Sequence, residues 1–156
     1  MEEPRFLADR MLAKLARWLA FLGYDARRAA DDEVDDAVLM EAARREGRVL
    51  LTRDRRMPPV KGLTVLVLRE EAFEAQLAEV LAALKLKPDP ARFFTRCSLC
   101  AARLEEVRRE DVLSELPEKV RAYDTRFTRC PACRRLYWSG THVERALALL
   151  AKLGLG

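Results

Sequence analysis

The sequence has no long hydrophobic run. Its most apolar stretches, Trp18 to Leu22 and Leu63 to Leu68, fall far short of the roughly 20 apolar residues that a membrane-spanning helix needs. The first residues, Met1-Glu2-Glu3-Pro4, carry neither the basic flank nor the apolar segment of a secretory signal. We therefore expect no membrane role and a location in the reducing cytoplasm. Half of the 156 residues are hydrophobic, which is enough for a buried core.

Several residue types are scarce or missing. His142 is the only histidine, and a lone histidine just after a threonine is more typical of a structural residue than of a catalytic one. The chain therefore offers neither a Ser-His-Asp nor a Cys-His nucleophile pair. Asparagine and isoleucine are absent and glutamine occurs once, so few amides are open to heat damage. This composition favours a heat-adapted source.

Cysteine occurs only four times, and all four residues belong to two Cys-x-x-Cys pairs: Cys97 with Cys100, and Cys130 with Cys133. Each pair can present two thiolates to one ion from a tight turn, and two such pairs complete a tetrahedral shell. Two disulfides or a redox pair are the alternatives, and they need an oxidising compartment or a thioredoxin-like context. The spacing predicts a structural Zn²⁺ site.

The net charge of +4 is unevenly distributed. Residues 1–95 carry 17 basic and 17 acidic side chains, whereas residues 96–156 carry 12 and 8. Four thiolates around one Zn²⁺ sum to −2, which lowers the charge of the zinc-loaded second part to about +2. Net charge is therefore weak support for nucleic-acid binding, and a DNA-directed zinc ribbon is the least favoured interpretation.

Short apolar segments alternate with helical patterns along the first 90 residues. The patterns predict strands at 6–8, 26–29, 49–52 and 63–68. They predict helices at 12–22, from the acidic run 31–36 to Gly47, and at 73–84. Such alternation is typical of an α/β fold with a mostly parallel sheet and flanking helices. Pro88 and Pro90 mark a linker, so we expect one domain over 1–90 and a small zinc-ribbon domain over 91–156.

The second part contains a polar insert that we expect to be partly helical between residues 110 and 123. Thr141-x-x-Glu144 has the spacing of a capping box and predicts the start of a final helix. Leu147, Leu150 and Leu153 are expected to form the inner face of this helix.

Asp9 and Asp54 each follow an apolar strand closely. The carboxyl ends of parallel strands line one crevice, so these two acids are expected to face the same site. The acidic run 31–36 starts the helix before the strand at 49–52 and can add a third carboxylate. Clustered carboxylates are costly without a cation, and oxygen ligands suit Mg²⁺ or Mn²⁺. Helix capping or an ordinary turn is the alternative role for each acid.

Arg10, Lys14 and Arg17 have helical spacing and form a basic stripe that begins beside Asp9. A phosphate backbone would find both positive charge and metal there. The alternative is an ordinary solvated helix face opposite the leucines.

Several segments together resemble a known family. They are FLADRML (residues 6–12), KLARWL (14–19), LGYD (22–25), RVLLTRDR (48–55) and YWSGTH (137–142). The chain resembles the mut-seven C-terminal ribonuclease-like domain, a PIN-like nuclease fold followed by a zinc ribbon. The match covers nearly the whole chain, and its motifs occur in the expected order.

The resemblance implies a Mg²⁺- or Mn²⁺-dependent ribonuclease that acts on RNA. Asp9 and Asp54 match the strand-end acids of the family, and Asp36 matches the acid that opens the second helix, with Asp32 as the competing choice. Arg10 and Lys14, with Arg17 further along the stripe, would hold RNA phosphates. The alternative function is a non-catalytic RNA-binding or assembly module that keeps the fold.

Overall fold

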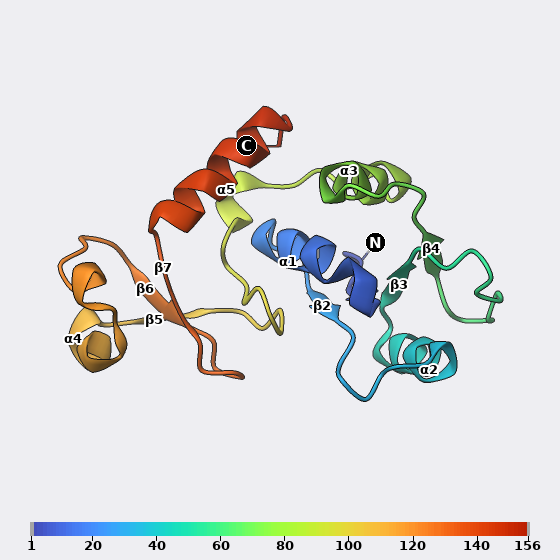
Figure 1. Cartoon of the computed structure of the whole chain (residues 1–156), viewed down its shortest axis with the longest axis horizontal. Coiled ribbons are helices and arrows are strands. Elements are labelled where there is room, and N and C mark those ends of the chain that lie inside the picture. Colours follow the sequence, from blue (N-terminus) through green and yellow to red (C-terminus); the bar gives the residue numbers. More distant parts are fainter. Residues whose placement is uncertain (1, 156) are drawn as a thin grey trace. The chain divides into compact units, whose positions relative to one another are not determined.

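The structure is a computed structural model that describes residues 2–155, and it divides into two compact units, Met1–Ala101 and Ala102–Gly156. The first unit contains a four-stranded sheet (Figure 1). Its strands are β1 (Phe6–Ala8), β2 (Ala26–Arg28), β3 (Val49–Thr52) and β4 (Val65–Val67). All pairings are parallel, in the order β2-β1-β3-β4.

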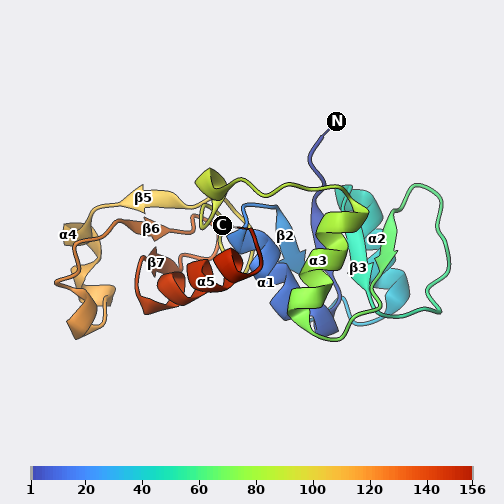
Figure 2. The same cartoon turned by 90° about the horizontal axis from the view of Figure 1, so that it is seen from above.

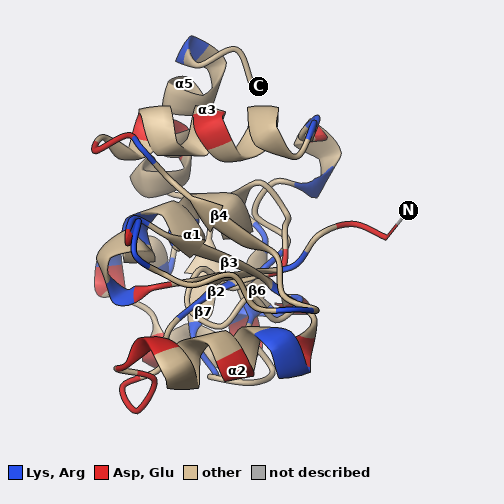
Figure 3. Ribbon diagram, turned by 90° about the vertical axis from the view of Figure 1, so that its right-hand side faces the viewer, with Lys and Arg blue, Asp and Glu red and all other residues tan. Residues whose placement is uncertain are grey.

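Helices cover both faces of this sheet. They are α1 (Ala13–Phe21), which follows the 3-10 turn Arg10–Leu12, then α2 (Asp36–Glu46) and α3 (Phe73–Ala83). α1 and α3 contact each other and lie on one face, whereas α2 lies on the other (Figures 2 and 3). The predicted α/β class with a parallel sheet and flanking helices is confirmed. Within residues 2–155, no helix is both long and apolar enough to cross a membrane.

The packing of the core explains why the sequences of the inner strands, β1 and β3, are continuously apolar. Every residue of β1 is fully buried, as are Leu50 and Leu51 of β3. A strand packed on both faces has no polar side, so it lacks the alternation of a half-exposed strand. On the α2 side, one cluster joins sheet and helix: Leu7, Ala29, Leu39, Ala42, Ala43 and Leu50.

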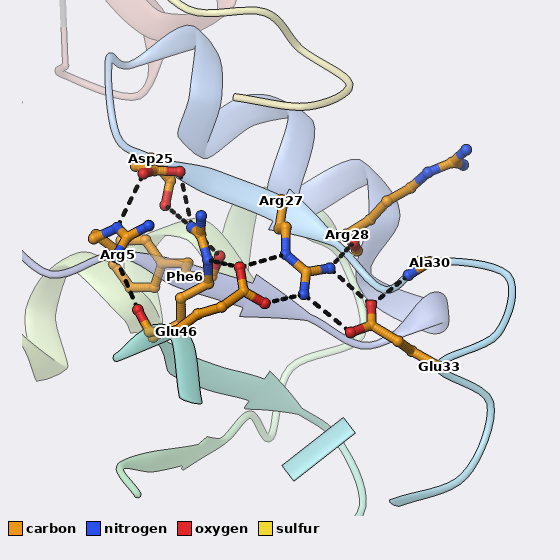
Figure 4. A network of polar contacts seen from close by, with 9 residues as sticks. Arg5, Phe6, Asp25, Arg27, Arg28, Ala30, Glu33 and Glu46 are labelled. Atoms are coloured by element: carbon orange, nitrogen blue, oxygen red, sulfur yellow. Dashed lines mark hydrogen bonds and ion pairs between the residues drawn. The ribbon is translucent and has the colours of Figure 1, made fainter. Parts of the chain in front are cut away.

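The edge strand β2 carries two arginines, and an ionic network accommodates one of them (Figure 4). Arg27 donates hydrogen bonds of 2.7 and 3.0 Å to the two carboxylate oxygens of Glu33 and also binds Glu46 of α2. Arg48 is buried and donates to Glu46 at 3.0 Å and to Asp25 at 2.8 Å. Because these charges are paired and hydrogen-bonded, they tie β2 to α2 without leaving an isolated buried charge.

The network predicts a loss of stability in acid. The hydrogen bonds from Arg27 lower the pKa of Glu33 from 4.5 to about 2, with help from the Ala30 backbone N–H and the charge of Arg45. Its contribution to the free energy of unfolding is therefore complete above pH 4.5 and is lost as the pH falls towards 2. The pKa of Glu46 is lowered by the same arginine, so it titrates in the same direction.

We expect Glu33→Gln to flatten this pH dependence. Urea unfolding of wild type and Glu33→Gln at pH 7 and pH 3 measures it, and the variant should lose less stability between the two pH values. Glu41→Gln is the comparison variant, because Glu41 forms an exposed ion pair with Arg44 on α2 and an exposed pair contributes little to stability. Equal losses in Glu33→Gln and wild type would show that the pair does not drive acid unfolding.

The second unit is a three-stranded antiparallel sheet with helices. Its strands β5 (Glu105–Val107), β6 (Phe127–Arg129) and β7 (Leu136–Trp138) are paired in that order. Between β5 and β6 lie α4 (Arg109–Val112) and the 3-10 turns Leu113–Glu115 and Glu118–Val120, so the expected partly helical insert is confirmed. The insert buries Val112, Leu116 and Val120 against Phe127.

The final helix, α5 (Thr141–Lys152), corrects two details of the sequence prediction. Gly140 is the N-cap residue and no side chain caps the helix, so the expected Thr141 capping box is wrong. The N-cap is one residue earlier than the capping box implies, because the Gly140 carbonyl accepts the N–H groups of both Val143 and Glu144. The buried residues of α5 are Ala146 and Leu150, whereas Leu147 and Leu153 are 43% and 36% exposed.

Candidate active site and metal centre

Two predicted site residues lie where the sheet topology favours ligand binding. In the order β2-β1-β3-β4, β2 lies on one side of β1 and β3 lies on the other. The crevice outside the carboxyl ends of β1 and β3 is therefore the switch point of the sheet, where α/β proteins usually bind ligands. Asp9 directly follows β1, and Asp54 lies two residues beyond β3.

Thr52 joins these two acids. Its hydroxyl donates a 2.7 Å hydrogen bond to Oδ2 of Asp9 and accepts a 3.1 Å hydrogen bond from the backbone N–H of Asp54. Thr52 is 1% exposed, so packing fixes this geometry. Sequence reasoning missed the residue, although a threonine that closes a strand two positions before an acid is a detectable signal.

Each strand-end acid also has a structural hydrogen bond. Oδ1 of Asp9 accepts the N–H of Met11 at 2.9 Å and caps the 3-10 turn, while Oδ1 of Asp54 accepts the N–H of Arg56 at 2.9 Å. The capping role considered from sequence is thus present in both residues. These bonds orient the carboxylates and leave lone pairs on each of them for a further ligand.

Asp36, the first residue of α2, lies beside Asp54 and within the electrostatic reach of Asp9. Desolvation, a side-chain hydrogen bond with Asp54 and the charges of Asp54 and Asp9 together raise the pKa of Asp36. The pKa of Asp54 is lowered, chiefly by the backbone N–H of Arg56. These opposite shifts mean that Asp36 takes up a proton at a higher pH than Asp54 does.

The other residues of the acidic run have different surroundings. Asp32 is exposed and lines a cavity of about 660 Å³ together with Glu33 and Arg45. Glu33 binds Arg27, and Asp35 caps α2 by accepting the N–H of Val38 at 2.9 Å. Of the two acids weighed for the third position, Asp36 has the interactions with Asp54 and Asp9.

Basic side chains surround the carboxylates. Arg10 belongs to the 3-10 turn after Asp9, and Lys14 and Arg17 follow on α1, all three exposed. Arg56, which was not singled out from sequence, places its Nε 3.6 Å from Oδ1 of Asp54 with its side chain 93% exposed. The crevice therefore combines negative charge with mobile cations that can meet a phosphate.

The carboxylates suit a hard divalent ion that keeps part of its water shell. Within residues 2–155, only the cysteines form a set of three or more thiol, imidazole or carboxylate groups whose ligand atoms all lie within 4.8 Å of one another. The acids are thus spaced too widely for a closed protein cage. Mg²⁺ is usually held by one or two carboxylates with several waters, so a set of acids this open would need waters to complete the shell of such an ion.

The four cysteine sulfurs do converge. Sγ atoms of Cys97, Cys100, Cys130 and Cys133 all lie within 4.8 Å of one another. A tetrahedral ion with metal–sulfur bonds of about 2.3 Å would separate its ligands by about 3.8 Å. Cys97 and Cys130 are fully buried. This cluster at the C-terminal end has the donors and the spacing of a zinc-ribbon site.

The two cysteine pairs have the same local backbone. Ala101 and Arg134 each follow the second cysteine of a pair and have positive φ values of 63° and 69°. Their N–H groups donate at 2.9 Å to the carbonyls of Cys97 and Cys130, respectively. The N–H of Leu99 lies 3.5 Å from Sγ of Cys97, and that of Cys133 lies 3.4 Å from Sγ of Cys130. The two pairs therefore present their sulfurs from matching tight turns.

The protein thus combines a parallel α/β sheet, acids at the switch point of that sheet and a cluster of four cysteines. A family model described as "Mut7-C RNAse domain" matches residues 4–150. The chain belongs to this family, and the resemblance seen in the sequence is confirmed. No curated protein and no solved structure matches the chain.

Proposed function

We propose that the protein is a divalent-metal-dependent ribonuclease that hydrolyses RNA phosphodiester bonds at Asp9, Asp36 and Asp54. The observation that carries this proposal is the meeting of these acids at the β1/β3 switch point, in a chain of an RNase domain family. Desolvation, together with the neighbouring Asp54 and Asp9, raises the pKa of Asp36, and a cation would offset the negative charge.

The residues of the crevice have separate tasks in the proposed reaction. Mg²⁺ or Mn²⁺, when bound, would supply positive charge that stabilises the phosphoryl oxygens and makes water a better nucleophile. Asp9, Asp36 and Asp54 would hold the cation, directly or through its waters, and the hydrogen bond from Thr52 fixes the Asp9 carboxylate. The water oxygen attacks phosphorus and gives up a proton, one phosphorus–oxygen bond breaks, and the leaving oxygen takes up a proton.

The basic side chains position the RNA. Arg10, Lys14 and Arg17 lie on the exposed surface that begins beside Asp9, where they can neutralise successive phosphates. Holding the scissile phosphate next to the attacking water uses binding free energy to offset part of the entropic cost of bringing the two together.

The proposed role of the four cysteines is structural. Cys97, Cys100, Cys130 and Cys133 would bind one Zn²⁺ in a closed shell without an open position for substrate. The ion would contribute folding free energy to a unit whose own apolar cluster is small.

Cleavage of an end-labelled single-stranded RNA by the purified protein tests the function. We expect cleavage by the zinc-loaded protein with Mn²⁺ or Mg²⁺ and none when both ions are omitted. The fragment lengths then separate internal cutting from trimming at an end. An RNA that is bound but stays intact with both ions would contradict the ribonuclease and favour the non-catalytic RNA-binding module.

Thr52→Val provides a second prediction, because it removes the hydroxyl that joins Asp9 and Asp54. Loss of a group that orients a metal ligand typically lowers activity or metal affinity by about 10- to 100-fold. We expect a decrease of this size in kcat, with a higher Mn²⁺ requirement and little change in KM for RNA. Thr52→Ser keeps the hydroxyl and should restore most of the activity. If Thr52→Ser and Thr52→Val are equally impaired, Thr52 acts through packing alone.

A further inference from the structure

A hollow of about 400 Å³ is lined by Met11, two residues after Asp9, and the proposed mechanism does not use it. Met11, whose N–H donates to Asp9, forms one wall, and Phe73 at the start of α3 forms another. Met11 is 84% exposed, the highest value among the exposed large hydrophobic side chains within residues 2–155. An exposed thioether next to a reaction centre adapts readily to flat ligands.

Phe73 is held firmly on its inner side. The ring of Trp18 stacks on it with a centroid separation of 5.3 Å and an interplanar angle of 25°. The ammonium group of Lys14 lies 4.1 Å from the Phe73 ring centroid. A cation over an aromatic ring is bound only weakly at an exposed site, so Lys14 can leave for a phosphate and uncover the ring.

The charges of the hollow select the kind of group that enters. Glu71 and Glu74 line it, so a phosphate would be repelled from its interior. Lys14 lies on its lining, and Arg53 lies 3.6 Å from Glu71, so cations are available close to it. An RNA strand therefore fits best with its phosphate at the cations and an uncharged base in the hollow.

We propose that this hollow, bounded by Met11 and Phe73, is a nucleobase subsite that holds a base of the RNA strand next to the phosphate at Asp9. The proposal rests on RNA being the ligand of the proposed active site. Stacking of a base on an aromatic side chain adds affinity without sequence selection. The subsite would fix the register of the strand relative to the carboxylates.

Binding of fluorescein-labelled single-stranded RNA by the zinc-loaded protein, with no Mn²⁺ or Mg²⁺ added, tests the subsite without any cleavage. The comparison uses an ordinary oligonucleotide and one of the same length made of abasic ribose phosphates, which keeps the charges and removes the bases. Wild type should bind the ordinary strand about fivefold or more tightly. Met11→Ala and Phe73→Leu should each reduce this ratio by at least about half. Leu113→Ala is the control, because Leu113 is also an exposed apolar residue, on a different element.

The two possible failures are distinguishable. Equal binding of both strands by wild type, or an unchanged ratio in both Met11→Ala and Phe73→Leu, would overturn the subsite whether or not RNA is cleaved. A base-dependent affinity that Met11→Ala weakens, combined with no cleavage in Mn²⁺ or Mg²⁺, would support the subsite and contradict the ribonuclease.

Discussion

Asp54→Asn should abolish RNA cleavage while the protein stays folded. The amide oxygen of asparagine can still accept the N–H of Arg56, so the turn after β3 is kept. The negative charge that would hold the cation is lost, and we expect cleavage to fall by more than about 100-fold, the upper range for residues that only orient a ligand. The melting temperature should be unchanged or higher, because Asp36 no longer faces a neighbouring charge.

Asp32→Asn is the matched control for this experiment. It makes the same chemical change on an acid that lines a different cavity, so its cleavage rate should stay near that of wild type. Undiminished cleavage by Asp54→Asn would exclude Asp54 as a required ligand. A loss of cleavage in Asp32→Asn alone would identify Asp32, rather than Asp36, as the third carboxylate.

Cys130→Ser should release the bound zinc and unfold the second unit. Structural Zn²⁺ sites contribute on the order of 10 kcal/mol or more to the folding of small modules, and a serine hydroxyl does not replace a thiolate at neutral pH. Zinc content measured by mass spectrometry and amide hydrogen exchange of residues 102–155 follow the two effects. We expect less than one zinc per chain and rapid exchange in β6 and β7.

Ala132→Ser is the control for the zinc experiment. It adds a hydroxyl inside the same exposed turn and leaves all four thiols in place. This variant should keep one zinc and wild-type protection. A folded Cys130→Ser protein with a full zinc content would contradict a four-cysteine site.

The inner strands were predictable because β1 and β3 are short, largely buried and clearly bounded. The limits expected for β1 and β3 match the structure, since polar residues follow both apolar runs directly. The expected strand over 63–68 shortens to Val65–Val67, because Leu63 lies in the turn before it. Of the three leucines expected on the inner face of α5, Leu150 is buried, whereas Leu147 and Leu153 are exposed. The domain boundary expected after residue 90 stays a prediction.

The site was predictable only in outline. Position after a strand identifies Asp9 and Asp54, because parallel strands bring their carboxyl ends together. The acidic run is different, because its five acids look alike in the sequence. Tertiary contacts separate Glu33, bound to Arg27, from Asp36, next to Asp54, whereas a local hydrogen bond from Val38 identifies Asp35 as the cap of α2. The hydrogen bond from Thr52 to Asp9 and the exposure of Met11 are tertiary features, although the place of Thr52 two positions before an acid was a detectable signal.

Mn²⁺ binding is the most direct test of a metal centre formed by Asp9, Asp36 and Asp54. Electron paramagnetic resonance of the zinc-loaded protein reports the concentration of free Mn²⁺ during a titration. Wild type and Asp32→Asn should bind Mn²⁺ alike, whereas Asp9→Asn and Asp36→Asn should each bind it at least about tenfold more weakly. Unaltered Mn²⁺ affinity in both Asp9→Asn and Asp36→Asn would contradict a metal centre at the carboxyl ends of β1 and β3.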